Sequence, residues 1–379
     1  MHLSNLKISN FKSYTEADVD FCAGVNCLVG NNGVGKTNLL DAVYYLSFCK
    51  SHFNSIDTQN IRQGEEYFAL HGRYEGLAGQ PVQVSCIQRR GQSKQMRYDQ
   101  KACKTFAEHI GRIPLVIVSP TDQVLITGGS DVRRKFLNGV ISQTDQAYLQ
   151  NLLQYDKALA QRNRLLKQFY DDRYWDAPAI DIWDAQLVRY GTPLYEARRS
   201  FLERFIPIFN DYCNWISGLH ETVETAYVSQ MNDEPDLAKL LAGAQAADRY
   251  AQFTTAGPHK DDLTLALSGM PVKKFASQGQ QKTISLALKL AQFQYILDYT
   301  GVKPILLLDD IFDKLDLDRI KQLIQLVGSE RFGQVLLTDT QPGRVQQIFS
   351  ELPAVEHRIF QWSAEKDQWA MYNKAEEKQ

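Results

Sequence analysis

A glycine-rich loop near the start of the chain constrains its fold more than any other feature. Residues 30–37 match the pattern G-x-x-x-x-G-K-[ST] at every fixed position. An apolar run, residues 25–29, precedes the loop, and apolar residues at helical spacing follow it from Leu39 to Leu46. Strand, loop and helix in this order are the setting of a phosphate-binding loop, so the sequence predicts a nucleotide-binding α/β fold.

The residue types of this loop suit a triphosphate. Its glycines let main-chain N–H groups close around the phosphates, and the start of the following helix adds more donors. Lys36 supplies a cation and is a candidate catalytic residue, while the Thr37 hydroxyl is a candidate Mg²⁺ ligand. We therefore expect ATP and Mg²⁺ as cofactors. The expected ATP-binding residues are Gly30, Asn31, Asn32, Gly33, Val34, Gly35, Lys36 and Thr37.

The matching acidic strand lies almost at the end of the chain. The apolar run 305–308 is followed by Asp309 and Asp310. An ordinary buried parallel strand has the same apolar run, but open α/β sheets bind ligands at the carboxyl ends of their strands, where these two carboxylates stand. We expect Asp309 to hold Mg²⁺ together with Thr37, and Asp310 to polarise the attacking water as a catalytic residue.

A third motif opens a long helical pattern just before the acidic strand. It consists of Ser277, Gln278, Gly279 and Gln280. A Ser-x-Gly at a helix start can be a simple N-cap, and it also offers a hydroxyl and free N–H groups to an anion. The order of phosphate loop, Ser-x-Gly helix and acidic strand resembles ATP-binding-cassette ATPases. In that superfamily this signature of one subunit closes over the γ-phosphate bound to the other, which implies an ATP-dependent homodimer.

The resemblance extends further along the chain. Residues 3–14 and the phosphate loop resemble the heads of chromosome-maintenance and double-strand-break-repair ATPases, whose heads are split by long coiled coils. This chain shows no sustained heptads. Its whole length is similar to the short member of that group, the RecF family of bacterial recombination mediators. The matching segments are Ser51-His52, Ser119-Pro120, Arg133-Arg134, Tyr155, Gln161-Arg162-Asn163, Trp183-Asp184, Gly257–Asp262 and Ser277–Gln281.

The RecF resemblance implies a fold and a function. The implied fold is an α/β ATP-binding-cassette head, with a mixed sheet, an antiparallel β region and an inserted helical lobe. The implied function is ATP-dependent DNA binding in recombinational repair and replication. Two subunits would close on ATP, clamp double-stranded DNA near a single-strand gap, and reopen on slow hydrolysis. The implied partners are the RecO and RecR mediator proteins, which help to load the RecA recombinase.

Several positions depart from the family pattern. Lys260 stands where Arg is usual, which keeps the charge but loses the planar fork. Asn138 stands where Asp is common, and Asp41 where Glu is common. Residues 313–316 (DKLD) replace the usual Ser-Glu-Leu-Asp of a dimer-contacting loop, and residues 338–340 contain no His where cassette ATPases often have a γ-phosphate sensor. Asp310 stands where most cassette ATPases carry Glu, although RecF-like sequences commonly show Asp. Its shorter carboxylate lies farther from the water, so slow hydrolysis is expected.

Composition is compatible with this reading. The 379 residues are 44% hydrophobic and 23% charged, which suits a globular chain of one to three domains. No apolar stretch approaches the roughly 18 residues that span a membrane, and the N-terminus has no signal-peptide pattern. The six cysteines form no C-x-x-C pair, as in a reducing compartment. We therefore expect a cytoplasmic protein without a membrane partner.

The net charge is −2, so DNA binding would depend on local basic patches. One candidate patch falls on an expected antiparallel ribbon over residues 82–98, and another on helical segments. A solvated charged face would show the same residues, whereas phosphate contacts would give sequence-independent binding that weakens with salt. The first patch comprises Arg89, Arg90, Lys94, Arg97, Lys101 and Lys104, and the second comprises Arg133, Arg134, Lys135, Lys157, Arg162, Arg164 and Lys167.

The sequence predicts three segments. Residues 1–130 form the N-terminal part of the ATPase lobe, and residues 131–250, where helical spacing prevails and Gly and Pro are few, form a helical insert. Residues 251–379 return to the ATPase lobe with the signature, the acidic strand and a further buried strand before residue 340.

Three other protein classes share part of this pattern. An ABC transporter ATPase subunit has the same motifs, but it is usually shorter and lacks the helical insert. A P-loop kinase would phosphorylate a small acceptor and leave the Ser-x-Gly helix without a role. A head fragment of a coiled-coil ATPase would need an arm. DNA binding measured with and without ATP separates the RecF-like function from these alternatives.

Overall fold

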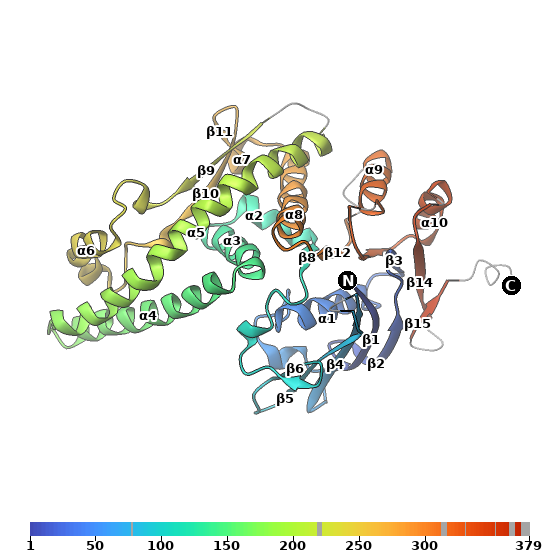
Figure 1. Ribbon diagram of the computed structural model, residues 1–379, viewed down its shortest axis with the longest axis horizontal. Helices are drawn as coiled ribbons and strands as arrows, with labels where there is room; N and C mark the ends of the chain where they lie inside the picture. Colours follow the sequence, from blue (N-terminus) through green and yellow to red (C-terminus); the bar gives the residue numbers. More distant parts are fainter. Residues whose placement is uncertain are drawn as a thin grey trace. The chain divides into compact units, whose positions relative to one another are not determined.

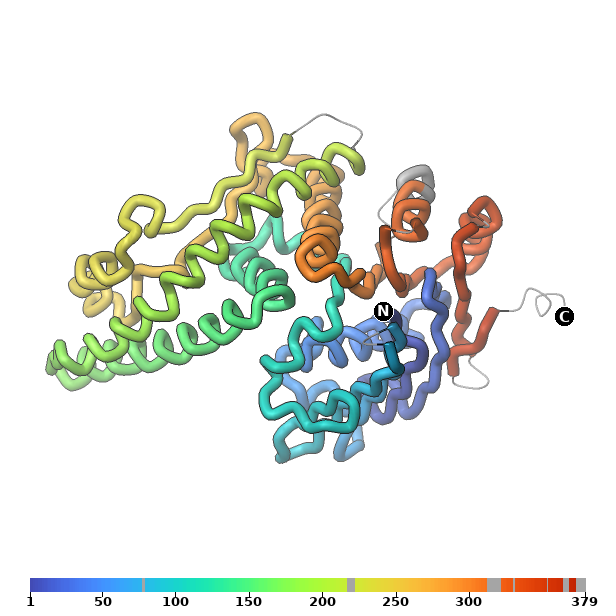
Figure 2. The backbone as a smooth tube through the Cα atoms, in the orientation of Figure 1, coloured from blue at the N-terminus to red at the C-terminus, as the bar shows by residue number. Residues whose placement is uncertain are grey.

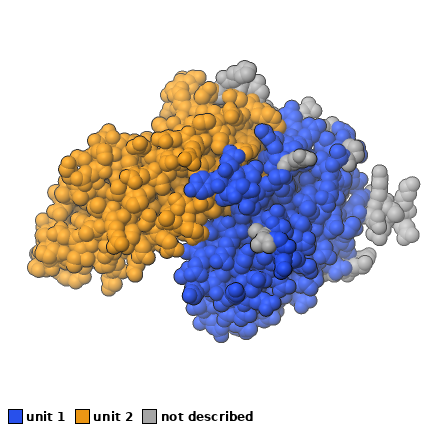
Figure 3. Space-filling model, viewed as in Figure 1, with its two compact units in different colours: residues 1–121, 296–379 blue, residues 122–295 orange. Residues whose placement is uncertain are grey.

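The structure is a computed structural model that describes residues 1–76, 79–217, 222–311, 317–329, 331–352, 354–363 and 368–372. The chain divides into two compact units, shown in Figure 3: unit 1 comprises residues 1–121 and 296–379, and unit 2 comprises residues 122–295. The chain therefore returns from unit 2 to unit 1 inside helix α8 (Gln278–Thr300), whereas the sequence placed that boundary at residue 250. The reason is that strand β10 (Asp262–Leu267) pairs with β9 (Val223–Val228) and so stays in unit 2.

The parallel sheet of unit 1 joins segments from both ends of the chain. Its strand order is β15-β14-β3-β13-β12-β8, and only β15 runs antiparallel to its neighbour. Figure 1 shows the blue β3 beside the red β14, and β3 also pairs with β13 on its other side. Continuous apolar runs predicted β3, β8, β12 and β13, which are buried at every position, whereas β14 and β15 were not predicted. The bounds are β3 Val25–Val29, β8 Leu115–Val118, β12 Ile305–Leu308, β13 Val335–Asp339, β14 His357–Ser363 and β15 Gln368–Met371.

A second sheet of unit 1 is antiparallel, with the order β2-β1-β4-β5-β6-β7. The ribbon predicted over residues 82–98 is confirmed as β5 and β6. Helix α1 (Lys36–Phe48) shares one buried core with both sheets, since Leu39 and Val43 belong to the same cluster as Leu6 of β1 and Leu307 of β12. The bounds are β1 His2–Phe11, β2 Tyr14–Asp20, β4 Tyr67–Glu75, β5 Val82–Arg89, β6 Gln95–Tyr98 and β7 Lys101–Ala102.

The remaining elements of unit 1 are helical. Helix α9 follows β12, helix α10 follows β13, and two short 3₁₀ turns precede β4 and β8. The bounds are α9 Leu317–Val327, α10 Pro342–Glu351, η1 Asp57–Asn60, η2 Phe106–Glu108 and, at the boundary with unit 2, η3 Pro120–Gln123.

Unit 2 is mainly helical, as predicted. Figure 2 shows its two long helices, α4 and α5, packed along each other. Helix α5 stays continuous through Pro193 and Pro207. The helical prediction for residues 131–250 missed strand β9, because its partner β10 lies beyond that range. The bounds are α2 Val124–Thr127, α3 Ser130–Thr144, α4 Gln146–Asp171, α5 Ala177–Ser217, η4 Gln230–Asn232, α6 Leu237–Ala251, η5 Pro258–Lys260, β11 Met270–Pro271 and α7 Val272–Phe275.

A buried polar network surrounds the Gly257–Asp262 segment in unit 2. The Arg198 side chain is 2% exposed and donates to the Pro258 carbonyl at 2.7 Å and to the Asp261 carboxylate at 2.8 Å. Tyr227 donates to the same carboxylate, and the Tyr155 hydroxyl lies 2.8 Å from His259 Nδ1. Buried charges are tolerated when they are paired in this way. The segment therefore joins α4, α5 and β9 in unit 2.

No helix among the described residues has both the length and the apolar character that a membrane span requires.

Candidate nucleotide-binding site

The predicted phosphate loop connects β3 to α1, as its pattern requires. Gly33 and Gly35 adopt left-handed backbone conformations, with φ of 89° and 98°. At Gly35 a Cβ atom would lie 2.9 Å from the Tyr14 hydroxyl, so only glycine fits this position without displacing that group. Helix α1 has no side-chain cap at its start. Its first N–H groups are thus directed at the loop, where an anion is favoured.

The structure brings Lys36, Thr37 and Asp309 together in unit 1. Lys36 is 4% exposed, and its Nζ donates to the carbonyls of Gly30 at 2.7 Å and Asn31 at 3.1 Å. Thr37 Oγ1 lies 3.0 Å from each carboxylate oxygen of Asp309. Burial raises the pKa of the Asp309 carboxyl above its ordinary value, and hydrogen bonds from Thr338 and Thr37 oppose that rise.

These oxygens can hold a hard divalent cation. Among the described residues no group of three or more His, Cys, Asp or Glu side chains could form a metal site. The Thr37 hydroxyl and the Asp309 carboxylate instead offer a two-residue oxygen set. Mg²⁺ is usually held in this manner, with waters and substrate phosphates completing its coordination. The residues therefore fit the predicted Mg²⁺ site.

Asp310 follows Asp309 in an unusual backbone conformation. Its φ is 44°, in the left-handed region, and its N–H donates to the Thr338 hydroxyl at 2.8 Å. Thr338 belongs to residues 338–340, where cassette ATPases often have a γ-phosphate sensor. The sequence did not predict that Thr338 contacts Asp309 and Asp310. The sequence did carry a signal for these contacts. A hydroxyl beside Leu336 and Leu337 in a buried strand needs a hydrogen-bond partner.

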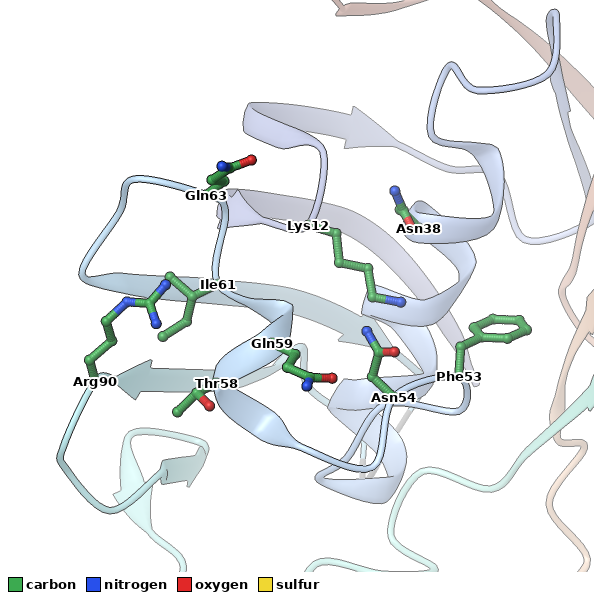
Figure 4. A pocket seen from close by; sticks show the side chains of 9 residues that line it. All are labelled: Lys12, Asn38, Phe53, Asn54, Thr58, Gln59, Ile61, Gln63 and Arg90. Carbon is green, nitrogen blue, oxygen red and sulfur yellow. The ribbon is translucent and has the colours of Figure 1, made fainter.

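A pocket of about 580 Å³ opens beside the start of α1. Figure 4 shows Lys12, from the turn after β1, and Asn38, from α1, on this pocket together with Phe53 and Asn54. Lys12 Nζ lies 2.6 Å from the buried Asp41 carboxylate. The pocket thus has polar amide groups, an aromatic ring and a cation whose charge is already paired.

The back of the phosphate loop is supported by the hairpin of β14 and β15. The Tyr14 hydroxyl donates to the Gly35 carbonyl at 3.0 Å, and Trp369 Nε1 donates to the Tyr14 hydroxyl at 2.8 Å. Both side chains are buried. Residues near the two ends of the chain therefore fix the carbonyl at the start of α1, a contact that the sequence did not predict.

The Ser277 signature forms a capping box at the start of α8 in unit 2. The Gln280 N–H donates to Ser277 Oγ at 3.2 Å, and the Ser277 N–H donates to Gln280 Oε1 at 2.9 Å. The serine is thus an N-cap, one of its two expected roles. Its hydroxyl accepts in this contact and keeps a proton with which to donate to an anion.

The first basic patch is exposed except at one position. Arg89, Arg90, Arg97, Lys101 and Lys104 are exposed on and around β5, β6 and β7. The Lys94 side chain is only 7% exposed, and its Nζ lies 2.6 Å from the Asp57 carboxylate. A buried and paired lysine is poorly placed for a DNA phosphate, which corrects the expectation for Lys94.

Three of the seven residues in the second basic patch are held by contacts within unit 2. Arg133 is 15% exposed and makes a two-point contact with Asp262, at 2.7 and 2.8 Å. Arg134 donates to the Asp261 carbonyl at 2.6 Å. The Arg162 side chain is fully buried and paired with two aspartates. The buried or paired Arg133 and Arg162 are therefore poorly placed for a DNA phosphate, whereas Lys135, Lys157, Arg164 and Lys167 are exposed.

The predicted dimer-contacting segment, Asp313-Lys314-Leu315-Asp316, lies outside the described residues.

Comparisons with known proteins agree with this architecture. The family described as the RecF/RecN/SMC N terminal domain matches residues 2–358. The DNA replication and repair protein RecF of Flavobacterium johnsoniae is 47% identical over 348 residues, which cover 92% of this chain and 96% of that protein. The RecF of Parabacteroides distasonis is 46% identical over 348 residues, covering 92% and 94% of the two chains.

Solved structures show the same fold. The recombination mediator protein RecF in its complex with ATPrS has a TM-score of 0.88 at 28% identity and covers 98% of both chains. The Smc head domain from Pyrococcus furiosus has a TM-score of 0.56 at 16% identity, covering 98% of this chain and 96% of that one, and so shares the fold alone. The predicted fold class is thereby confirmed. From this full-length similarity, the chain belongs to the RecF family of DNA replication and repair proteins.

Proposed function

We propose that the chain is an ATP-dependent DNA-binding protein of recombinational repair and replication, acting in the cytoplasm. It would dimerise on ATP at double-stranded DNA beside single-strand gaps, and hydrolyse ATP slowly. The observation that carries this proposal is the assembly of Lys36, Thr37 and Asp309 at one edge of the parallel sheet. Similarity to a RecF structure with ATP, at a TM-score of 0.87, supports the same ligand.

In this proposal the loop 30–37 binds the triphosphate. Lys36 would supply the cation, and the first N–H groups of α1 would complete the phosphate contacts. Thr37 and Asp309 would hold Mg²⁺, which supplies charge neutralisation at the phosphates when bound. Asn38 follows Thr37 and lines the pocket of about 580 Å³. The nucleoside end of ATP would therefore lie in that pocket, next to Phe53 and Asn54.

Asp310 would orient and deprotonate the attacking water. Its carboxylate stands directly after the metal-ligand position, at the carboxyl end of β12. Aspartate reaches less far than glutamate, so the water would be held less closely and turnover would be slow. Slow hydrolysis suits a clamp that has to stay closed while other proteins act.

The signature residues Ser277, Gln278, Gly279 and Gln280 would contact the γ-phosphate held by a second subunit. Ser277, Gln278 and Gly279 are exposed, and the Ser277 hydroxyl has a proton to donate. An exposed helix start with free N–H groups is a suitable anion-binding surface. ATP would thus join two copies of the chain, each completing the site of the other.

DNA would contact the exposed part of the first basic patch. Arg89, Arg90, Arg97, Lys101 and Lys104 stand on one antiparallel region of unit 1. Contacts of these side chains to phosphates would bind duplex DNA without sequence preference. RecO and RecR are the proposed protein partners in loading recombinase, by likeness to relatives of the RecFOR pathway.

The test is DNA binding with and without ATP. Fluorescently labelled gapped duplex, intact duplex and single strand are titrated with the protein in Mg²⁺ plus ATP, Mg²⁺ plus ADP, or no nucleotide. We expect ATP to strengthen duplex binding, most at the gap. Equal binding in all three nucleotide conditions would contradict the proposal. Transfer of the γ-phosphate of ATP to a small acceptor instead of water would favour the P-loop kinase alternative.

A further inference from the structure

Thr338 is a buried hydroxyl located between the two halves of the catalytic site. It lies on β13, which separates β3, before the phosphate loop, from β12, before Asp309. The Thr338 side chain is 0% exposed. Its Oγ1 lies 3.0 Å from Asp309 Oδ1 and 3.4 Å from Asp310 Oδ1, and it accepts the Asp310 N–H at 2.8 Å. One side chain thus contacts both acidic residues.

The single proton of this hydroxyl decides what these contacts do. A threonine hydroxyl donates once and accepts up to twice. The shorter distance assigns the proton to Asp309, and the lone pairs receive the Asp310 N–H. This arrangement leaves the Asp310 carboxylate without that donor, so it stays free to accept a proton from water. It also orients the Asp309 oxygen that faces the Thr37 hydroxyl.

The backbone of Asp310 needs such a support. Its φ of 44° is a conformation that residues other than glycine adopt rarely, although aspartate tolerates it better than most. Conformations of this kind persist where surrounding contacts determine them. The hydrogen bond from the Asp310 N–H to Thr338 Oγ1 is such a contact, and it fixes the direction in which the Asp310 side chain leaves the strand.

We propose that Thr338 is a positioning residue for ATP hydrolysis, whose hydroxyl fixes Asp309 and Asp310 relative to each other. The inference rests on the proposed function of Asp310 and goes beyond it, because Thr338 itself needs no contact with nucleotide. A purely structural role in β13 would require only a side chain of the right shape. The hydroxyl is therefore the group to test.

The experiment compares Thr338→Ser with Thr338→Ala, two variants that differ only in the hydroxyl, and adds Thr338→Val as the variant of native shape. Thr300→Val is the control. Its hydroxyl donates to the Ile296 carbonyl at the end of α8, before the amino end of β12. For each variant kcat and KM for ATP, ATP affinity in Mg²⁺ and in EDTA, and Tm are measured.

We expect Thr338→Ala and Thr338→Val to lower kcat by about a hundred-fold, the scale of a misplaced catalytic group. ATP affinity in EDTA should stay within about twofold, because Lys36 and the loop are unchanged, while the gain in affinity from Mg²⁺ should shrink by about tenfold as Asp309 loses its support. Thr338→Ser should restore most of both properties. Thr300→Val should match the native chain.

Two results overturn the inference. One is a Thr338→Ala variant with the same kcat as Thr338→Ser at equal Tm. The other is a loss of ATP affinity in EDTA in Thr338→Ala. That loss would mean that the hydroxyl supports the folding of the phosphate loop and does not position the two aspartates. Asp310→Asn, measured in parallel, separates the two proposals. If Asp310→Asn keeps full turnover, the proposed base is wrong. If it loses turnover while Thr338→Ala keeps it, only the role of Thr338 is wrong.

Discussion

The Thr37 hydroxyl lies 3.0 Å from both carboxylate oxygens of Asp309, although 272 positions separate the two residues in the chain. Thr37 follows β3 and Asp309 follows β12, with β13 between these parallel strands. Parallel strands bring their carboxyl ends to one edge, so two distant loops meet there. The two proposed cation ligands are thus supplied by opposite ends of the sequence and brought together by the sheet.

Lys36→Ala should strongly weaken ATP binding without unfolding the chain. The ammonium of Lys36 donates to two loop carbonyls and is the only loop cation. Losing a charge-assisted contact of this kind should weaken ATP binding by about ten- to a hundred-fold or more. Isothermal titration with ATP and Mg²⁺ measures the loss, and Tm checks the fold. Native affinity in a folded Lys36→Ala protein would refute the assignment of the loop.

The sequence predicted most of this site because its parts are local patterns. The loop 30–37 specifies its own turn and helix start, and the apolar runs before Gly30 and Asp309 are long enough to indicate buried strands. Ser277 and Gln280 have the spacing of a capping box, which their hydrogen bonds confirm. Resemblance to RecF then supplied the order of these parts in one chain.

The rest depended on contacts between distant segments. Lys94 and Arg162 belong to basic stretches, but Asp57, Asp184 and Asp248 neutralise them in the fold. A sequence shows which side chains are charged but not which charges are paired in the fold. Basic residues in buried ion pairs therefore look the same in the sequence as basic residues of a solvated patch. Strand β9 was missed for the same reason, because it is stabilised by hydrogen bonds to β10, a partner that lies farther along the chain.

Arg198→Ala should strongly destabilise unit 2. The change removes the cationic partner of the buried Asp261 carboxylate and the side-chain donor of the Pro258 carbonyl. Breaking a buried ion pair by removing one partner costs about 3–5 kcal/mol. Urea unfolding followed by circular dichroism measures the loss. The adjacent Arg199 is the matched control, since its side chain is 63% exposed and its ion pair with Glu203 lies on the surface. Equal midpoints for Arg198→Ala and Arg199→Ala would show that the network is unimportant.

His259 should make the stability of the protein fall in mild acid. Burial lowers the pKa of His259 from 6.5 to about 4, with the charges of Lys260 and Arg134 acting in the same direction. The unfolded chain therefore binds a proton at this residue between pH 6.5 and 4, where the folded chain does not. Stability present above pH 6.5 is lost as the pH falls to about 4, by on the order of 2–3 kcal/mol.

The His259→Gln variant tests that pH dependence. A glutamine can accept from the Tyr155 hydroxyl and donate to the Thr254 carbonyl, as the neutral imidazole does, yet it does not titrate. Its Tm should decline less steeply than that of the native chain between pH 6.5 and 4. Parallel Tm curves over that range would assign the acid sensitivity to groups other than His259.

The last prediction links the signature to DNA. Ser277→Arg places bulk where the partner's phosphate is proposed to lie, and it also removes a cap worth about 1 kcal/mol. Ser277→Asp keeps the cap but repels a phosphate, and Ser277→Thr keeps both cap and hydroxyl. We expect the Ser277→Arg and Ser277→Asp variants to bind ATP normally but not to dimerise with it, while Ser277→Thr dimerises as the native chain does. Sedimentation with a non-hydrolysable ATP analogue measures the dimerisation.

If only the closed dimer grips DNA, Ser277→Arg and Ser277→Asp should also lose ATP-stimulated duplex binding. The residual binding would come from exposed side chains such as Arg97 and Lys101 and should weaken steeply with salt. DNA titrations at two salt concentrations measure it. Since the Asp variant keeps the cap of α8, loss of dimerisation in both variants cannot be attributed to fraying of that helix. A Ser277→Asp protein that dimerises with ATP would refute the role of the signature, and one that stays monomeric yet binds duplex at full strength would refute the clamp.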